Sequence, residues 1–183
     1  MSSLRKKILI PILFLLGLLL IFMLQKHPGS DMVSIEPGKS APDFMIKDLK
    51  GNAVRLSDFR GKLIFLNFWA TWCPPCREEM PSIEDLYRSM QGRPFQILAA
   101  SVDDDPSQVE GFRKFGGYTF PMFMDQRQEA AALYRTTGVP ETFLIGPDGT
   151  LLYKVIGPRD WTDPQITGVF EQILSKINTN RQP

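Results

Sequence analysis

Residues 62–79 read KLIFLNFWATWCPPCREE, and this stretch decides the fold. Its first half is a continuous apolar run, which is typical of a strand buried on both faces. Two cysteines separated by two prolines follow at 73–76, and beyond them apolar side chains recur at helical spacing as far as Met90. The stretch therefore predicts a buried strand, a tight turn that carries both cysteines, and a helix.

The spacing of the cysteines favours redox chemistry at this turn. A thiolate attacks disulfides, and the free N–H groups at a helix start stabilise its negative charge. Pro74 and Pro75 preset the first helical turn. We therefore expect Cys73 to be the nucleophile and Cys76 the resolving thiol. A purely structural disulfide would close too small a loop to stabilise a domain, and a zinc site would need four ligands where only His27 could add to the thiols.

The flanking sequence predicts an α/β domain. A turn signal at 50–52 predicts a hairpin over 44–56 at a sheet edge, and a second buried strand is expected at 95–102. Later elements are expected in the order helix 106–115 with Asp105 as its cap, apolar stretch 120–124, helix 128–135, strand 141–145, strand 151–156 and helix 164–177. Four aromatic residues are expected to fill the core near the first of these helices: Phe112, Phe115, Phe120 and Phe123.

The N-terminal region has a different composition. Three cations at 5–7 precede an uncharged apolar run, so residues 1–7 are predicted to stay cytoplasmic, 8–25 to be a transmembrane signal anchor, 26–36 a tether and 37–180 the folded domain. A cleaved signal peptide and a buried core helix are the alternatives.

Composition narrows the function. The chain has 183 residues with 43% hydrophobic and 22% charged residues, enough for one sizeable domain. Its net charge of +1 does not suit a nucleic-acid partner. The lone histidine, His27, leaves the folded domain without Cys-His or Ser-His catalysis. Three acids at 103–105 could suggest a cation site, although acids before a proline are usually a solvated turn and helix cap.

The segment NFWATWCPPCREEMP at 67–81 resembles the active-site segment of the thioredoxin superfamily, in particular its exported TlpA, ResA and CcmG-like branch of AhpC/TSA-redoxin type. GKSAPDFMIKDLKGNAVRLSDFRGKLIFLNFWA at 38–70 and TTGVPETFLIGPDGTLLYKVIG at 136–157 extend the resemblance over about residues 35–178. It implies a thioredoxin fold, in which helices flank a central mixed sheet, with an N-terminal β-hairpin, an inserted helix-strand segment and one preceding transmembrane helix.

The resemblance also implies roles for individual residues. It implies a cis peptide bond between Val139 and Pro140, opposite the cysteines, with the backbone of Val139 pairing with bound substrate peptide. Glu79 matches an acid near the thiols and would accept the proton of Cys76, the alternative being a solvated surface residue. Thioredoxin carries a buried acid where this chain has Asn67, so proton handling must differ.

Further substrate contacts are expected around the turn. Trp72 is expected to be a partly exposed platform for substrate, beside Pro74 and Pro75, whereas Trp69 is expected in the core. Glu141 could shape peptide choice, and a surface acid at a strand end is an equally good account.

The function implied is a membrane-anchored thiol-disulfide oxidoreductase that exchanges a Cys73-Cys76 disulfide with exported proteins. By resemblance it is a reductant in cytochrome c maturation that acts on apocytochrome c, receives electrons from a membrane donor of the DsbD or CcdA kind, and needs no cofactor or metal. It would be a single-pass protein of the bacterial inner membrane with its catalytic domain on the periplasmic side. An oxidant of folding proteins, a copper carrier and a peroxidase are the alternatives, and the turn residues leave the direction of electron flow open.

Overall fold

The computed structural model describes residues 17, 35–103 and 105–179. Nearly all of the predicted anchor at 8–25 and of the tether at 26–36 lies outside these residues. Within the part of the chain that is described, no helix combines the length and the apolar character needed to cross a membrane.

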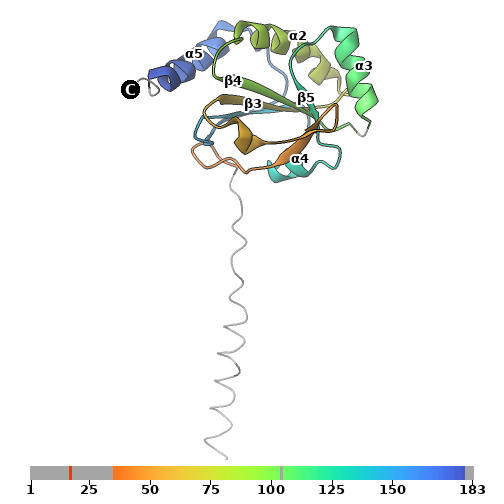
Figure 1. The fold of residues 1–183 in the computed structure, drawn as a ribbon, viewed down its shortest axis with the longest axis horizontal. Helices are drawn as coiled ribbons and strands as arrows, with labels where there is room; N and C mark the ends of the chain where they lie inside the picture. Colours follow the sequence, from red (N-terminus) through yellow and green to blue (C-terminus); the bar gives the residue numbers. More distant parts are fainter. Residues whose placement is uncertain (1–16, 18–34, 104, 180–183) are drawn as a thin grey trace, which may run out of the picture. The chain divides into compact units, whose positions relative to one another are not determined.

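The elements of the domain alternate between strands and helices (Figure 1). In chain order they are β1 Met45–Asp48, β2 Ala53–Arg55, the 3-10 helix η1 Leu56–Phe59, β3 Leu63–Trp69, α2 Pro74–Ser89, β4 Phe95–Ser101, α3 Pro106–Gly116, β5 Met122–Met124, α4 Glu129–Leu133, β6 Glu141–Ile145, β7 Leu151–Ile156 and α5 Pro164–Thr179. The order and type of the predicted elements are confirmed.

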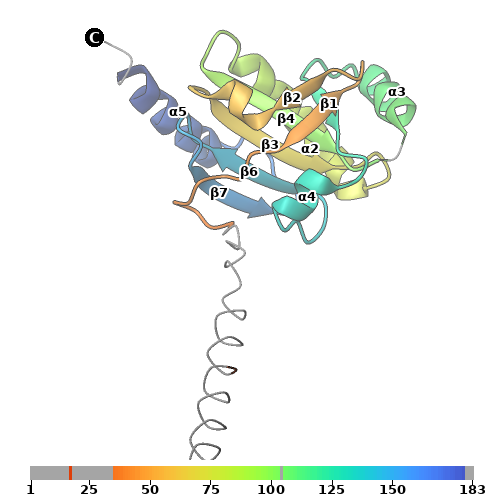
Figure 2. The same ribbon diagram turned by 60° about the horizontal axis from the view of Figure 1, so that its bottom comes forward.

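All seven strands join one mixed sheet in the order β2-β1-β5-β4-β3-β6-β7 (Figure 2). The strand β3 pairs in parallel with β4 and antiparallel with β6, so the strand that leads into the cysteine turn lies within the sheet. The predicted hairpin forms as β1 and β2, with β2 at the sheet edge. These features confirm a thioredoxin-like α/β fold.

The two faces of the sheet are packed by different elements. Phe65 of β3 contacts Phe170 of α5 and Trp161, whereas Phe68 contacts Tyr134 at the end of α4 on the other face. Successive side chains of a strand point to opposite faces, which explains this division. Figure 1 shows α2 and α5 on one side of the sheet and α4 on the other.

The helix α3 belongs to the inserted segment. Of the four aromatic residues predicted to fill the core near it, one lies in solvent instead. Phe120 and Phe123 are buried and Phe112 is partly buried against Trp69, as expected. The prediction for Phe115 is wrong, because its side chain is 93% exposed. At about 100° per residue, position 115 is rotated roughly 120° from buried Val109, so it points out of the core.

Candidate active site

The two cysteines lie at the start of α2 and form a disulfide. Cys73 is the N-cap residue with an extended backbone, and Pro74 and Pro75 occupy the first helical positions, as the sequence predicts. The backbone N–H of Cys76 points at the Cys73 sulfur, at an N to Sγ distance of 3.2 Å. The helix N-terminus is therefore aimed at the sulfur of Cys73, which is the arrangement that stabilises a thiolate there once the disulfide is opened.

Exposure differs along the turn. Trp72 is 65% exposed and Pro74 is exposed, whereas Cys76 is completely buried and Cys73 is 3% exposed. Trp69 is fully buried, as predicted. The exposed part of the turn is therefore Trp72 and Pro74, the two residues that flank Cys73 in the chain.

A buried acid, Asp103, braces the loop that precedes Cys73, and no local sequence pattern indicates this role. Asp103 accepts hydrogen bonds from Thr71 N at 2.8 Å, from Thr71 Oγ1 at 2.6 Å and from Ser101 Oγ at 2.6 Å. Asp105 instead caps α3 by accepting from Ser107 N at 2.8 Å, as expected. Both described acids of this run thus have protein partners.

The loop before β6 lies against the redox turn. The peptide bond between Val139 and Pro140 is cis, as the resemblance implies. The carbonyl oxygen of Val139 lies 3.5 Å from the Cys73 sulfur. Pro140 is buried and Val139 is half-buried. The backbone group that lies beside the Cys73 sulfur is therefore the carbonyl of Val139.

Glu141 is 1% exposed, so the account of it as a surface acid at a strand end is wrong. Its Oε1 accepts from Thr137 N at 3.0 Å and from Thr137 Oγ1 at 2.6 Å, and its Oε2 lies 3.0 Å from Lys154 Nζ. Lys154 also donates to the carbonyl oxygen of Arg135 at 3.3 Å. Because these contacts enclose residues 135–141, Glu141 and Lys154 hold the cis-proline loop in place.

Glu79 is buried at 2% exposure, although its neighbour Glu78 is exposed. Its Oε1 accepts from Asn67 Nδ2 at 2.9 Å, and its Oε2 from Trp161 Nε1 at 3.1 Å and from Arg159 N at 3.3 Å. Burial raises the pKa of Glu79 to about 6, although these three donors oppose the shift. Glu79 lies one helical turn after Cys76, and its burial excludes the alternative of a solvated surface residue.

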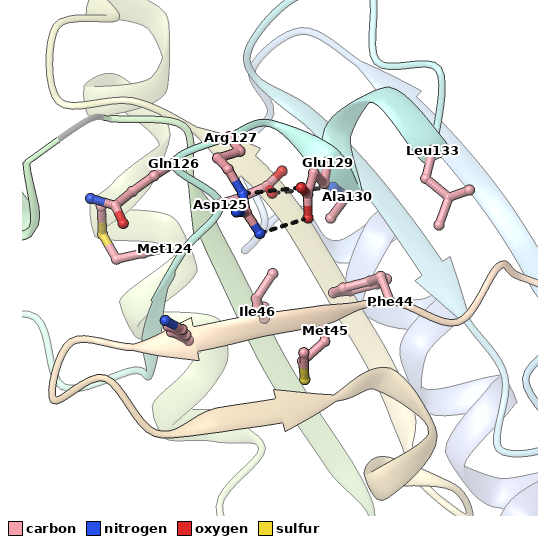
Figure 3. A pocket seen from close by; sticks show the side chains of 11 residues that line it. Phe44, Met45, Ile46, Met124, Asp125, Gln126, Arg127, Glu129, Ala130 and Leu133 are labelled. Carbon is pink, nitrogen blue, oxygen red and sulfur yellow. Dashed lines mark hydrogen bonds and ion pairs between the residues drawn. The ribbon is translucent and has the colours of Figure 1, made fainter.

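A separate hollow of about 430 Å³ lies between β1, β5 and α4 (Figure 3). Three of its charged side chains have partners: Arg127 pairs with Glu129 at 3.0 Å, and Asp125 accepts from Ala130 N and Ala131 N at the start of α4. It contains neither cysteine, so the reacting atoms lie elsewhere. Among residues 35–103 and 105–179, no group of three or more His, Cys, Asp or Glu is placed to hold a metal ion.

Comparison with known proteins places the chain among redox proteins of the same fold. The model of the AhpC/TSA family matches residues 37–154. The thiol-disulfide oxidoreductase ResA of Geobacillus kaustophilus (strain HTA426) is 40% identical over 128 residues, which are 70% of this chain and 74% of the relative. ResA of Bacillus thuringiensis (strain Al Hakam) is 35% identical over 152 residues, 83% of this chain and 87% of the relative.

A solved structure agrees with these relatives. A protein of Chlorobium tepidum assigned as a thiol:disulfide interchange protein DsbE superposes with a TM-score of 0.68 at 30% sequence identity. The match covers 79% of this chain and 99% of that structure. Relatives and structure alike carry names of thiol-disulfide exchange proteins.

Proposed function

The chain belongs to the AhpC/TSA family within the thioredoxin superfamily and is a ResA/CcmG-like thiol-disulfide oxidoreductase, and from this we propose that it is a membrane-anchored reductant of exported proteins. The observation that carries the redox part is the Cys73-Cys76 disulfide at the N-terminus of α2. In the proposal the reduced dithiol supplies two electrons to a disulfide of an exported partner.

The first step is attack by Cys73. Its thiolate, stabilised by the N–H of Cys76, attacks one sulfur of the partner's disulfide. A bond forms between Cys73 and that sulfur, and the other partner sulfur leaves as a thiolate that takes a proton from water. The carbonyl oxygen of Val139 lies beside the attacking sulfur of Cys73, and Trp72 precedes Cys73 with its side chain exposed, so these two residues are the proposed contacts for the partner's polypeptide, with Pro74 and Pro75 at the edge of the contact.

The second step releases the partner. Cys76 gives its proton to the Glu79 carboxylate and then attacks the Cys73 sulfur. The Cys73-Cys76 bond forms, and the second partner sulfur leaves as a thiolate and is protonated. The partner has then gained two electrons and two protons, and the enzyme is oxidised to the disulfide form that the structure describes.

We propose the bacterial inner membrane as the location, with one transmembrane segment at 8–25 and the domain on the periplasmic side. The cations at 5–7 before the apolar run support this orientation. Outside the cytoplasm the surroundings are oxidising, so a reductant must be recharged by electrons brought across the membrane. A membrane donor of the DsbD or CcdA kind would meet this need, and apocytochrome c, whose cysteines must be reduced before haem attachment, is the proposed substrate.

A trapping experiment tests the substrate. Cys76→Ser cannot resolve the mixed disulfide, so Cys73 should retain its partner for identification after gel separation without reductant. Cys73→Ser is the matched control and should retain little, because Cys76 is completely buried. Capture of apocytochromes supports the maturation role, whereas capture of many unrelated folding proteins contradicts it.

The direction of electron flow is tested by the redox equilibrium of the Cys73-Cys76 pair with glutathione. A reductant should have a potential well below that of the strong oxidant DsbA, which is about −120 mV. A potential as oxidising as that value would overturn the proposed direction and favour an oxidant of folding proteins.

A further inference from the structure

The segment between β7 and α5 is tied to the turn of α2 that carries the buried acid. Arg159 N and Trp161 Nε1 both donate to Glu79 Oε2. Trp161 N also donates to Ser82 Oγ at 3.1 Å, and this hydroxyl donates to the carbonyl oxygen of Glu79 at 2.8 Å. These bonds join positions about eighty residues apart in the chain, from 79 and 82 to 159 and 161.

The indole of Trp161 is itself held firmly. Its side chain is 1% exposed, and its ring meets the ring of Phe65 edge to face at a centroid distance of 4.7 Å. A buried indole N–H without an acceptor is costly, and a hydrogen bond to a charged acceptor is stronger than one between neutral groups. The bond between Trp161 and Glu79 therefore favours one position of the carboxylate and its ionised form.

We propose that Trp161 is a positioning residue for the redox reaction: its indole N–H fixes the Glu79 carboxylate, one helical turn after Cys76, and keeps it ready to accept a proton. The inference rests on the proposed role of Glu79 as the proton acceptor of Cys76. A proton acceptor must be ionised before the thiol gives up its proton. The three N–H groups that donate to the buried Glu79 carboxylate stabilise this ionised form.

The surroundings of Glu79 leave a route for the proton to solvent. A surface groove of about 540 Å³ runs between α2 and residues 158–162, and Glu79 forms part of its wall. The titratable and charged groups around the acid are Cys76 on α2, Glu78 and Asp85 on the outer side of α2, and Arg159 and Asp160 on the facing segment. The neutral amide of Asn67 on β3 also contacts Glu79, through its hydrogen bond to Oε1.

The chain offers a matched pair of tryptophans for the test. Trp69 is also fully buried, but its Nε1 has no hydrogen-bond partner in the described structure. Trp161→Phe and Trp69→Phe thus remove the same atoms, and only the first removes a hydrogen bond to Glu79. The ionisation of Glu79 can be followed in the full-length oxidised protein by carbon-13 NMR of the carboxyl group.

In Trp161→Phe the pH at which half of the Glu79 carboxyl is ionised should rise by about one unit, because the ionised form loses a donor. In Trp69→Phe this titration midpoint should not change. The pH profile of disulfide reduction by the reduced enzyme should move in the same direction. An unchanged midpoint in Trp161→Phe, or an equal move in both variants, would overturn the proposal. If Trp161→Phe does not fold, Ser82→Ala removes the anchor of the Trp161 backbone and should give a smaller upward move; an unchanged midpoint there contradicts the inference.

Glu79→Gln separates this inference from the proposed function. If Glu79→Gln leaves the pH profile of disulfide reduction unchanged, the proton-acceptor role of Glu79 fails and the catalytic meaning of Trp161 fails with it. If Glu79→Gln alters the profile but Trp161→Phe does not, only the role of Trp161 is wrong.

Discussion

The ammonium group of Lys154 lies 3.0 Å from the carboxylate of Glu141, the residue that directly follows the cis-proline. Glu141 is 1% exposed, and Lys154 supplies the only partner of Glu141 Oε2 among the described residues. The lysine comes from β7, so the second hairpin of the sheet supports the loop beside Cys73. This pair therefore ties β7 to the loop that holds the cis-proline.

Removal of the cation should therefore be costly. Lys154→Met leaves a buried carboxylate unpaired and should lower the free energy of unfolding by about 3 kcal/mol, as measured by urea denaturation. Arg127→Met is the matched control, because the pair between Arg127 and Glu129 is exposed, and it should cost less than about 1 kcal/mol. The double variant Lys154→Met/Glu141→Met should recover part of the loss, because it removes the unpaired carboxylate together with its two hydrogen bonds from Thr137. Equal losses in the single and double variants would show that the loss does not come from an unpaired Glu141 carboxylate.

Glu79 should make stability depend on pH. Its pKa rises from 4.5 to about 6 in the folded chain, so the folded state binds the proton more tightly than the unfolded state. The stabilisation of the folded state by proton binding at Glu79 is fully present below pH 4.5 and is lost as the pH rises through 6. The loss in the free energy of unfolding amounts to about 2 kcal/mol. Denaturant unfolding of the oxidised protein between pH 4 and 7 should show this fall.

Glu79→Gln is the comparison that isolates the carboxyl, since other acids titrate in the same range. The free energy of unfolding of the wild-type protein minus that of Glu79→Gln should fall as the pH rises from 4 to 7. A difference that stays constant from pH 4 to 7 would contradict the raised pKa of Glu79.

Asp103 should matter for both stability and rate. Asp103→Ala removes three hydrogen bonds and leaves Thr71 N without its acceptor, so it should cost about 1–3 kcal/mol and slow disulfide exchange by Cys73. Asp148→Ala is a matched control: Asp148 accepts from Thr150 N and Oγ1 in the β6–β7 turn, away from the cysteines. Equal exchange rates in the two variants would show that the brace on Thr71 has no effect on the redox turn.

Trp72 should contribute to substrate binding and little to folding. It is 65% exposed, so Trp72→Ala should change the unfolding free energy by less than about 0.5 kcal/mol. We expect kcat/KM to fall about tenfold for a protein disulfide and much less for a small disulfide, because only a polypeptide covers the indole. Tyr153→Ala, on a 47% exposed residue of β7, should leave both values unchanged.

Some features of this protein follow from short stretches of its sequence. The apolar run of β3, the two prolines after Cys73 and the turn residues at 50–52 act on their own neighbours, so strand, helix start and hairpin were predictable. The redox pair was predictable for the same reason, because Cys73 and Cys76 lie within one helical turn. The order of the elements then limited the fold to an α/β arrangement.

Other features depend on contacts that only the folded chain creates. Glu78 and Glu79 are adjacent, yet only Glu79 is buried, because about 100° of helix rotation points it at Asn67 and Trp161. The prediction that Phe115 lies in the core is wrong for the same reason, because its position around the axis of α3 points it into solvent.

The sequence alone thus determined where the sulfur chemistry takes place. Local patterns specify backbone conformation, and both cysteines belong to one local pattern. Tertiary structure decided which distant side chains contact the residues around that turn: Asp103, Lys154 and Trp161 reach their partners across 32, 13 and 82 residues of chain. Such partners are set by strand register and by the packing of helices on the sheet, and no short segment contains that information.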